Sequence, residues 1–199
     1  MLTLQRGRPA DESGRLPKEI RVYDLLDRLA VDYERIDHPA AMTMEACEEI
    51  DRALEATICK NLFLCNRQET EFFLLLMIED KPFKTKDVSK TIGKARLSFG
   101  KDEKLFEYLQ CRGGSISPMG LLFDKDNDVN LIIDEELLKF PEFCVHPCDN
   151  SGSLAIKTED FLKVFLRKSS NHLYAFHRNI CVSQKIPLLE QVGIFFKPP

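Results

Sequence analysis

The spacing of apolar side chains along this chain predicts where its helices and strands lie, since helices show an apolar residue every three to four positions and strands show short apolar runs. From Pro17 to Leu29 apolar residues recur at helical spacing, which predicts a helix. The same spacing predicts a second helix from about Asp102 to Gln110 and a third that begins at Thr158. A further helix is expected to start at Thr43, because threonine is a common N-cap residue.

Short apolar runs predict the strands. The strongest are Ile58 to Cys65 and Phe72 to Ile78, and the second is apolar at every position, as in a strand buried on both faces. The polar residues 67–70 between them predict a hairpin connection. Shorter candidates are Tyr33 to Ile36, Leu121 to Phe123, Val129 to Ile133, Phe143 to His146, Leu154 to Ile156 and Leu173 to Phe176. Interleaved strands and helices with short strand spacings predict an α+β fold, a mixed β-sheet surrounded by helices.

The length of 199 residues fits one domain with extensions. We expect a loosely held N-terminal extension over residues 1–16, the domain over 17–178, and a C-terminal tail over 179–199. The formal charge of −4 argues against a surface coated in basic residues, but leaves room for a local basic patch. No apolar run approaches about 18 residues, so neither a membrane span nor a membrane partner is expected.

Cysteine usage favours the cytoplasm. The seven cysteines include no C-x-x-C pair, which is typical of reduced thiols, and the polar start of the chain does not resemble a secretory signal. The only clustered Cys/His set is Cys144-Val-His-Pro-Cys148. A structural zinc needs further ligands at familiar spacing, which the chain does not supply, so no metal and no cofactor are expected.

The stretch Gly113-Gly-Ser-Ile-Ser-Pro-Met-Gly120 concentrates glycine, serine and proline between an expected helix and an apolar run. One interpretation is a tight structural turn. The other is a ligand loop, because glycine lets the backbone approach a ligand and free N–H groups and hydroxyls can hold phosphates or carbonyl oxygens. The pattern alone leaves both open.

Two further features allow both an ordinary and a functional interpretation. Lys60 interrupts an apolar strand, where it could occupy an exposed edge position or serve a site. The segment from Lys81 to Arg96 holds six basic residues against Asp87 alone, in a chain of net negative charge. Such a run is either a solvated face or a patch that meets a polyanion.

Four separated pieces of the chain match one known family in order and spacing. They are Lys60-Asn-Leu-Phe-Leu64, Gly93-Lys-Ala-Arg-Leu-Ser-Phe-Gly100, Gly114-Ser-Ile-Ser-Pro118 and Phe143-Cys-Val-His-Pro147. Together they resemble the YbaK/prolyl-tRNA-synthetase-associated editing domain family, and within it the free-standing deacylases of alanyl-tRNA(Pro). The resemblance covers about residues 17–170 and implies a compact mixed α+β domain. Cys148 departs from relatives, which often carry a different residue after His-Pro.

The resemblance implies hydrolysis of the ester that joins a wrong amino acid to tRNA(Pro). Alanine and cysteine are similar in size to proline, so a pocket that accepts proline cannot strongly exclude them, and a second hydrolytic site adds discrimination. Carried across by motif, the catalytic candidates are Lys60, Gly114 and His146. The candidates for substrate binding are His38, Asn61, Ser115, Ile116, Ser117 and Pro118. The candidates for tRNA binding lie in the basic segment: Lys84, Lys86, Lys90, Lys94 and Arg96.

The chemistry of these residues fits direct attack by water, with or without assistance from the 2′-OH of the terminal ribose, since no Ser-His-Asp or Cys-His relay is evident. Loop N–H groups from Gly114 to Pro118 could hold the ester carbonyl as it gains negative charge. His146 could be a pocket wall, an orienting donor or a base, and His38 a lining or structural residue.

The expected partner is the acceptor end of tRNA(Pro), with prolyl-tRNA synthetase as a second candidate partner and no DNA. The alternatives are a deacylase of Cys-tRNA(Pro) or another misacylated tRNA, and a relative that senses tRNA or an amino acid without turnover.

Overall fold

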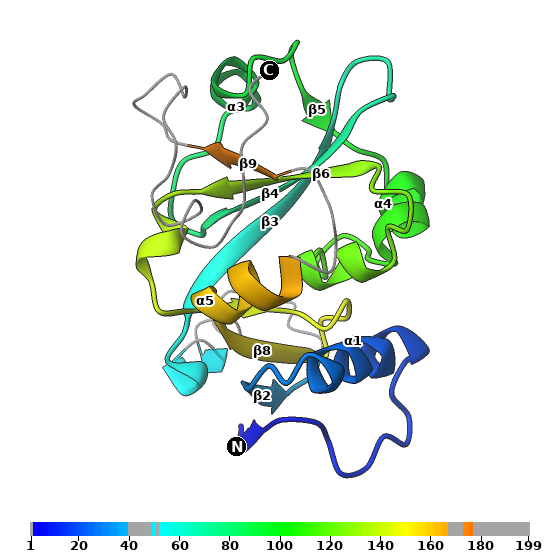
Figure 1. Ribbon diagram of the computed structural model, residues 1–199, viewed down its shortest axis with the longest axis vertical. Helices are drawn as coiled ribbons and strands as arrows, with labels where there is room; N and C mark the ends of the chain where they lie inside the picture. The colour runs from blue at the N-terminus through cyan, green and yellow to red at the C-terminus, as the bar shows by residue number, and fades with distance from the viewer. Residues whose placement is uncertain (1, 40–48, 51, 167–172, 177–199) are drawn as a thin grey trace.

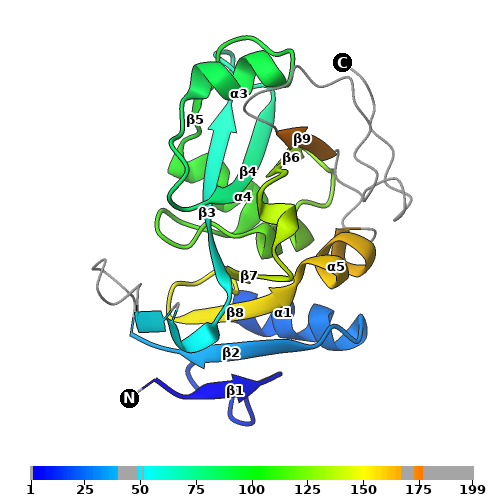
Figure 2. The ribbon, with the colours of Figure 1, turned by 90° about the vertical axis from the view of Figure 1, so that its left-hand side faces the viewer.

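A long strand, β3 (Thr57–Cys65), joins the two halves of a mixed sheet. We describe this fold from a computed structural model, which places residues 2–39, 49–50, 52–166 and 173–176. In Figure 2 the strands β1, β2 and β8 lie across the lower half, whereas β3 and β4 run up through the upper half. β3 therefore belongs to both halves, and residues along it can contact either one.

The strand order is β1-β2-β8-β7-β3-β4-β6-β9, and the short β5 pairs with β3 beside this path. The β3–β7, β4–β6 and β6–β9 pairs are parallel, and the other described pairs are antiparallel, so the mixed sheet expected from the sequence is confirmed. The strands besides β3 are β1 (Leu4–Arg6), β2 (Tyr33–Asp37), β4 (Phe72–Ile78), β5 (Ser98–Phe99), β6 (Val129–Asp134), β7 (Glu142–Val145), β8 (Gly152–Lys157) and β9 (Leu173–Phe176).

Helices cover both faces of the sheet (Figure 1). The main core lies under α1 (Pro17–Arg28), α4 (Asp102–Leu109), η1 (Pro118–Leu122), α5 (Thr158–Asp160) and its continuation η3 (Phe161–Phe165). A second, smaller core lies between the opposite face and α3 (Thr85–Thr91), where Val88 and Ile92 pack against Leu64 and Leu75. The short turn η2 is Leu137–Lys139.

The pairing of β3 leaves part of one edge open. On one side β3 pairs with β4 from Cys59 to Cys65. On the other side β7 reaches only Thr57 and Ile58, and β5 pairs only with Leu64 and Cys65. Within the described strands, residues 59–62 therefore have no strand partner on that side. The candidate site lies at this gap.

One expected strand is a helix. The apolar run Leu121 to Phe123 predicts an extended segment, but its first two residues end the 3-10 helix η1. Pro118 stands at the first position of this helix, where its fixed φ and missing N–H fit, and the Ser117 hydroxyl accepts a hydrogen bond from Met119 N at 3.1 Å. These two starting signals outweigh the short apolar run.

The N-terminal extension is partly ordered, contrary to the loosely held segment that the sequence predicts. Its strand β1 pairs antiparallel with β2. The Arg35 side chain is fully buried beneath it and donates to the Gly7 carbonyl, the Gln5 amide oxygen and Asp37. The expected helix at Thr43 lies outside the described residues.

Candidate functional site

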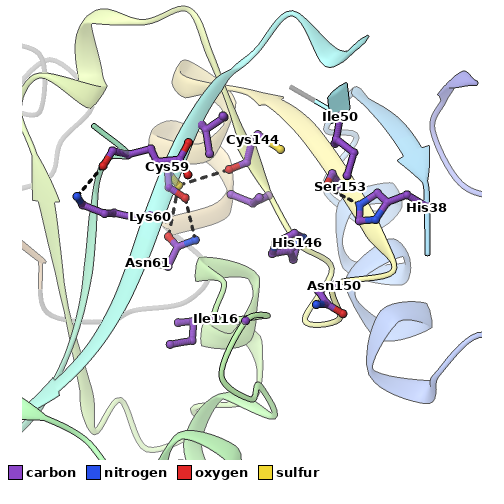
Figure 3. Close-up of a pocket in the computed structure, with 14 residues that line it drawn as sticks. His38, Ile50, Cys59, Lys60, Asn61, Ile116, Cys144, His146, Asn150 and Ser153 are labelled. Carbon is purple, nitrogen blue, oxygen red and sulfur yellow. Dashed lines mark hydrogen bonds between the residues drawn. The ribbon is translucent and has the colours of Figure 1, made fainter. Parts of the chain in front are cut away.

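A pocket of about 330 Å³ opens at the gap beside β3 (Figure 3). Its walls come from β3, the glycine loop before η1, the β7–β8 turn, and the end of β2. The lining residues are His38, Ile50, Ile58, Cys59, Lys60, Asn61, Glu79, Gly114, Ile116, Cys144, Val145, His146, Asn150 and Ser153. Segments far apart in the sequence thus meet at one site. The volume is in the range of small-molecule pockets.

Two histidines lie side by side in this pocket, with ring centroids 6.5 Å apart. His146 Nδ1 is 2.9 Å from the Gly152 carbonyl oxygen, and His38 Nδ1 is 2.9 Å from the Pro39 carbonyl oxygen. A carbonyl only accepts, so Nδ1 carries the proton in each ring and Nε2 holds the lone pair when the ring is neutral. His38 Nε2 then accepts from the Ser153 hydroxyl at 2.9 Å.

Burial lowers the pKa of His146 below its ordinary value, and the neighbouring His38 adds to this effect, while the hydrogen bond to Gly152 opposes it. His146 is therefore a neutral imidazole at neutral pH, with Nε2 able to accept a proton or a hydrogen bond. In Figure 3 it lies between the β3 side chains and His38, near the middle of the pocket.

Lys60 lines the pocket and is half-buried, so it does not occupy the exposed edge position that the pattern allowed. Its ammonium donates to the carbonyl oxygen of Glu79 at 2.6 Å and to that of Lys81. These bonds tie β3 to the segment that follows β4. The adjacent Asn61 also lines the pocket, where its side-chain oxygen is 3.3 Å from Cys59 Sγ.

The glycine loop contributes Gly114 and Ile116 to the pocket wall. Gly114 has φ +82°, a left-handed conformation that favours glycine. The predicted contacts Ser115, Ser117 and Pro118 are buried and do not line the pocket. Their polar groups serve the fold instead: the Ser115 hydroxyl bonds to both backbone groups of Arg112, and Ser117 donates to the His146 carbonyl. The latter bond joins the glycine loop to the histidine segment.

Five polar or sulfur-bearing lining residues were not among the site residues predicted from the sequence: Cys59, Glu79, Cys144, Asn150 and Ser153. Burial raises the pKa of the Cys59 thiol well above its ordinary range, so this thiol is a poor nucleophile at neutral pH. Asn150 and Ser153 belong to the polar stretch before and at the start of β8, the only local signal that could have indicated them.

The basic segment surrounds α3. The predicted tRNA-binding residues Lys84, Lys86, Lys90 and Arg96 are exposed. Lys94 forms an ion pair with Glu71 and is half-buried, so it is less available to a phosphate. None of these five residues lines the pocket.

Comparison with known proteins identifies the family. The profile of the aminoacyl-tRNA editing domain matches residues 38–164, which include every candidate catalytic residue. The chain belongs to the aminoacyl-tRNA editing domain family. The resemblance seen in the four motifs is thereby confirmed.

Relatives of this editing domain include the prolyl-tRNA editing protein ProX of Acetoanaerobium sticklandii, 33% identical over 70% of this chain and 85% of that protein. The prolyl-tRNA synthetase associated domain-containing protein 1 of Danio rerio is 28% identical over 78% of this chain and 84% of that protein. A crystal structure described as a candidate trans-editing enzyme for prolyl-tRNA synthetase has the same fold, with a TM-score of 0.60, 16% identity, and coverage of 80% of this chain and 96% of that one. No helix in the described part of this editing domain is both long and apolar enough to cross a membrane.

Proposed function

We propose that this protein hydrolyses the ester of mischarged tRNA(Pro), with Ala-tRNA(Pro) as its principal substrate. The observation that carries the proposal is the meeting of Lys60, Gly114 and His146 at one pocket, in a chain of the editing family. The ProX relative, named for editing of prolyl-tRNA, supports the choice of tRNA. A pocket of about 330 Å³ has room for a small aminoacyl group and the ribose that carries it.

In the proposed reaction a water molecule attacks the ester carbonyl. Neutral His146 accepts a proton at Nε2, either directly from that water or from the adjacent 2′-OH, whose oxygen then takes the proton of the attacking water. The proton on His146 passes to the ribose 3′-oxygen as the ester bond breaks. Main-chain N–H groups of the Gly114 loop stabilise the negative charge that develops on the carbonyl oxygen. A protonated thiol at Cys59 leaves water as the nucleophile.

Lys60 has a positioning role in this proposal. Its bonds to the Glu79 and Lys81 carbonyls fix one wall of the pocket and keep a positive charge beside it. The substrate is tRNA released by, or presented with, prolyl-tRNA synthetase in the cytoplasm. The exposed basic residues around α3, which are Lys84, Lys86, Lys90 and Arg96, bind its phosphates.

The test is a deacylation assay with tRNA(Pro) charged with alanine, cysteine, serine or proline. Alanine release is expected to be fastest, and Pro-tRNA(Pro) is expected to be spared. Lys60→Ala is expected to lower the rate of alanine release, because it removes the positive charge and the hydrogen bonds to the Glu79 and Lys81 carbonyls that fix the pocket wall. Lys139→Ala, an exposed lysine on η2, is the matched control and is expected to behave as wild type.

Each other outcome selects an alternative. Faster release of cysteine than of alanine would assign the protein to Cys-tRNA(Pro). Binding of tRNA without release of any amino acid would favour a sensor that does not turn over its ligand.

A further inference from the structure

Phe99 on β5 is the most exposed of the large apolar side chains in the described part of the chain, with 62% of its surface accessible. Its ring packs against Phe83, with centroids 5.8 Å apart and planes tilted by 53°. Phe83 in turn packs on the small core under α3. One side of Phe99 is therefore supported by a fixed aromatic neighbour, and most of the ring remains open.

The strand register places Phe99 on the same face as Lys60. Phe99 lies directly opposite Leu64 in the antiparallel β3–β5 pair, and opposite residues project to the same side. Lys60 and Leu64 are four residues apart on one strand, so their side chains also share that side. At about 3.3 Å per residue, Phe99 lies roughly 13 Å along β3 from the pocket wall.

Positive charge flanks this aromatic pair. Lys84 follows Phe83 directly, and Arg96 lies three residues before Phe99; both are exposed. The nearby carboxylates Glu71 and Glu69 are paired with Lys94 and Lys101. Asp87 is the only acidic residue between Phe83 and Lys101. An exposed aromatic ring among basic residues suits a single-stranded nucleic acid, because bases stack on the ring while cations hold the phosphates.

We propose that Phe99, supported by Phe83, is a stacking platform for an unpaired nucleotide of the tRNA acceptor end. The proposal rests on the proposed function, in which the pocket holds the terminal aminoacylated adenosine. Stacked nucleotides advance about 3.4 Å each, so the three nucleotides of CCA cover about 10 Å stacked and more when extended. The platform is thus within reach of a nucleotide close to the end. Lys84 and Arg96 bind the adjoining phosphates.

The experiment measures the affinity of the full chain for two uncharged RNA hairpins, one ending in a single-stranded ACCA and one with a blunt end. Wild type is expected to bind the overhang more tightly. Phe99→Ala is expected to weaken binding of the overhang by roughly 5- to 150-fold and to leave the blunt hairpin unaffected, because the stacking partner is removed. Phe99→Trp is expected to retain the preference, and Phe99→Leu to abolish it.

Phe140→Ala, another exposed phenylalanine, is the control and is expected to bind both hairpins as wild type does. Equal affinity of wild type and Phe99→Ala for the overhang overturns the proposal, as does a wild type without preference for it. A change of oligomeric state in Phe99→Ala, with RNA affinity unchanged, also overturns it and assigns the ring to a protein interface. If the protein releases no amino acid in the deacylation assay but the hairpin affinities are as expected, the proposed hydrolysis is refuted and the stacking role of Phe99 is retained.

Discussion

The chemistry of His146 depends on its surroundings. The Gly152 carbonyl fixes the proton on Nδ1, and burial keeps the ring neutral, so the lone pair is on Nε2. The Ser117 hydroxyl donates a hydrogen bond to the backbone carbonyl of His146 and so holds the His146 segment against the glycine loop. The ring is thus set in one tautomer before any substrate binds.

The pH dependence of kcat/KM tests this role. The neutral ring is the active form, so activity is expected to fall only as the pH drops through the lowered pKa of His146. The midpoint of this fall is expected below the ordinary histidine pKa of about 6.5. Above the midpoint the activity is expected to level off and to stay constant toward pH 8. His146→Gln is expected to be slow and to lack this acid limb. A midpoint above the ordinary value, or an unchanged limb in the variant, would contradict the role.

At the residue scale, motifs predicted the main lining residues better than they predicted side-chain contacts. Lys60, Gly114 and His146 were all indicated by the sequence and all line the pocket. The partner of the Ser117 hydroxyl lies 29 residues away, a contact that only the folded chain defines. The same holds for Ser153, which meets His38 across 115 residues.

At the scale of elements, the glycine loop is held in place by the packing of η1 against the end of α4. A Cβ at Gly120 would lie 2.7 Å from the Leu109 carbonyl oxygen and 2.8 Å from Leu109 Cβ. The two helices can therefore approach this closely only with glycine at that position. Since the loop that carries Gly114 leads directly into η1, this contact also positions the pocket wall.

Gly120→Ala is expected to lower the free energy of unfolding by about 1–3 kcal/mol, because α4 and η1 must separate. Gly113→Ala is the matched control, since a Cβ there would come no closer than 4.0 Å to another group, the Asp102 carboxylate. Its unfolding free energy is expected to stay within about 0.5 kcal/mol of wild type. Urea denaturation measures the unfolding free energy of both variants. Equal values for Gly120→Ala and Gly113→Ala would show that stability does not depend on the close contact between Gly120 and Leu109.

The sequence predicted the elements with long or strongly periodic patterns, such as α1, β3 and β4, and also short strands such as β2 and β6 to β9. It did not predict β1 or α3, for physical reasons. Three residues of β1 become ordered by pairing with β2 and by covering buried Arg35, both long-range effects. The seven residues of α3 are mostly polar, and their helix depends on burying Val88 against the sheet.

At the scale of the whole molecule, charge is distributed unevenly. The chain has a net charge of −4, yet exposed basic residues gather around α3, next to the face that carries Phe99. A net negative protein repels RNA at long range, so such a patch directs binding to one side of the molecule.

The salt dependence of tRNA binding tests this patch. The double variant Lys86→Ala/Lys90→Ala is expected to flatten the slope of log K against log salt by roughly 1.4 to 1.8, about 0.7 to 0.9 for each phosphate that a lysine no longer neutralises. The control double variant Lys125→Ala/Lys139→Ala changes two exposed lysines outside α3 and is expected to keep the wild-type slope. If the Lys86→Ala/Lys90→Ala variant keeps the same slope as the control variant, the basic residues around α3 form an ordinary solvated face.

The joining of two half-sheets by β3 places the pocket where both halves contribute side chains. The most direct test of its function is the rate at which the full chain releases alanine from Ala-tRNA(Pro), compared with spontaneous hydrolysis in the same buffer. We expect release far above the spontaneous rate, with Pro-tRNA(Pro) left intact under the same conditions. Alanine release at the spontaneous rate would contradict the assignment.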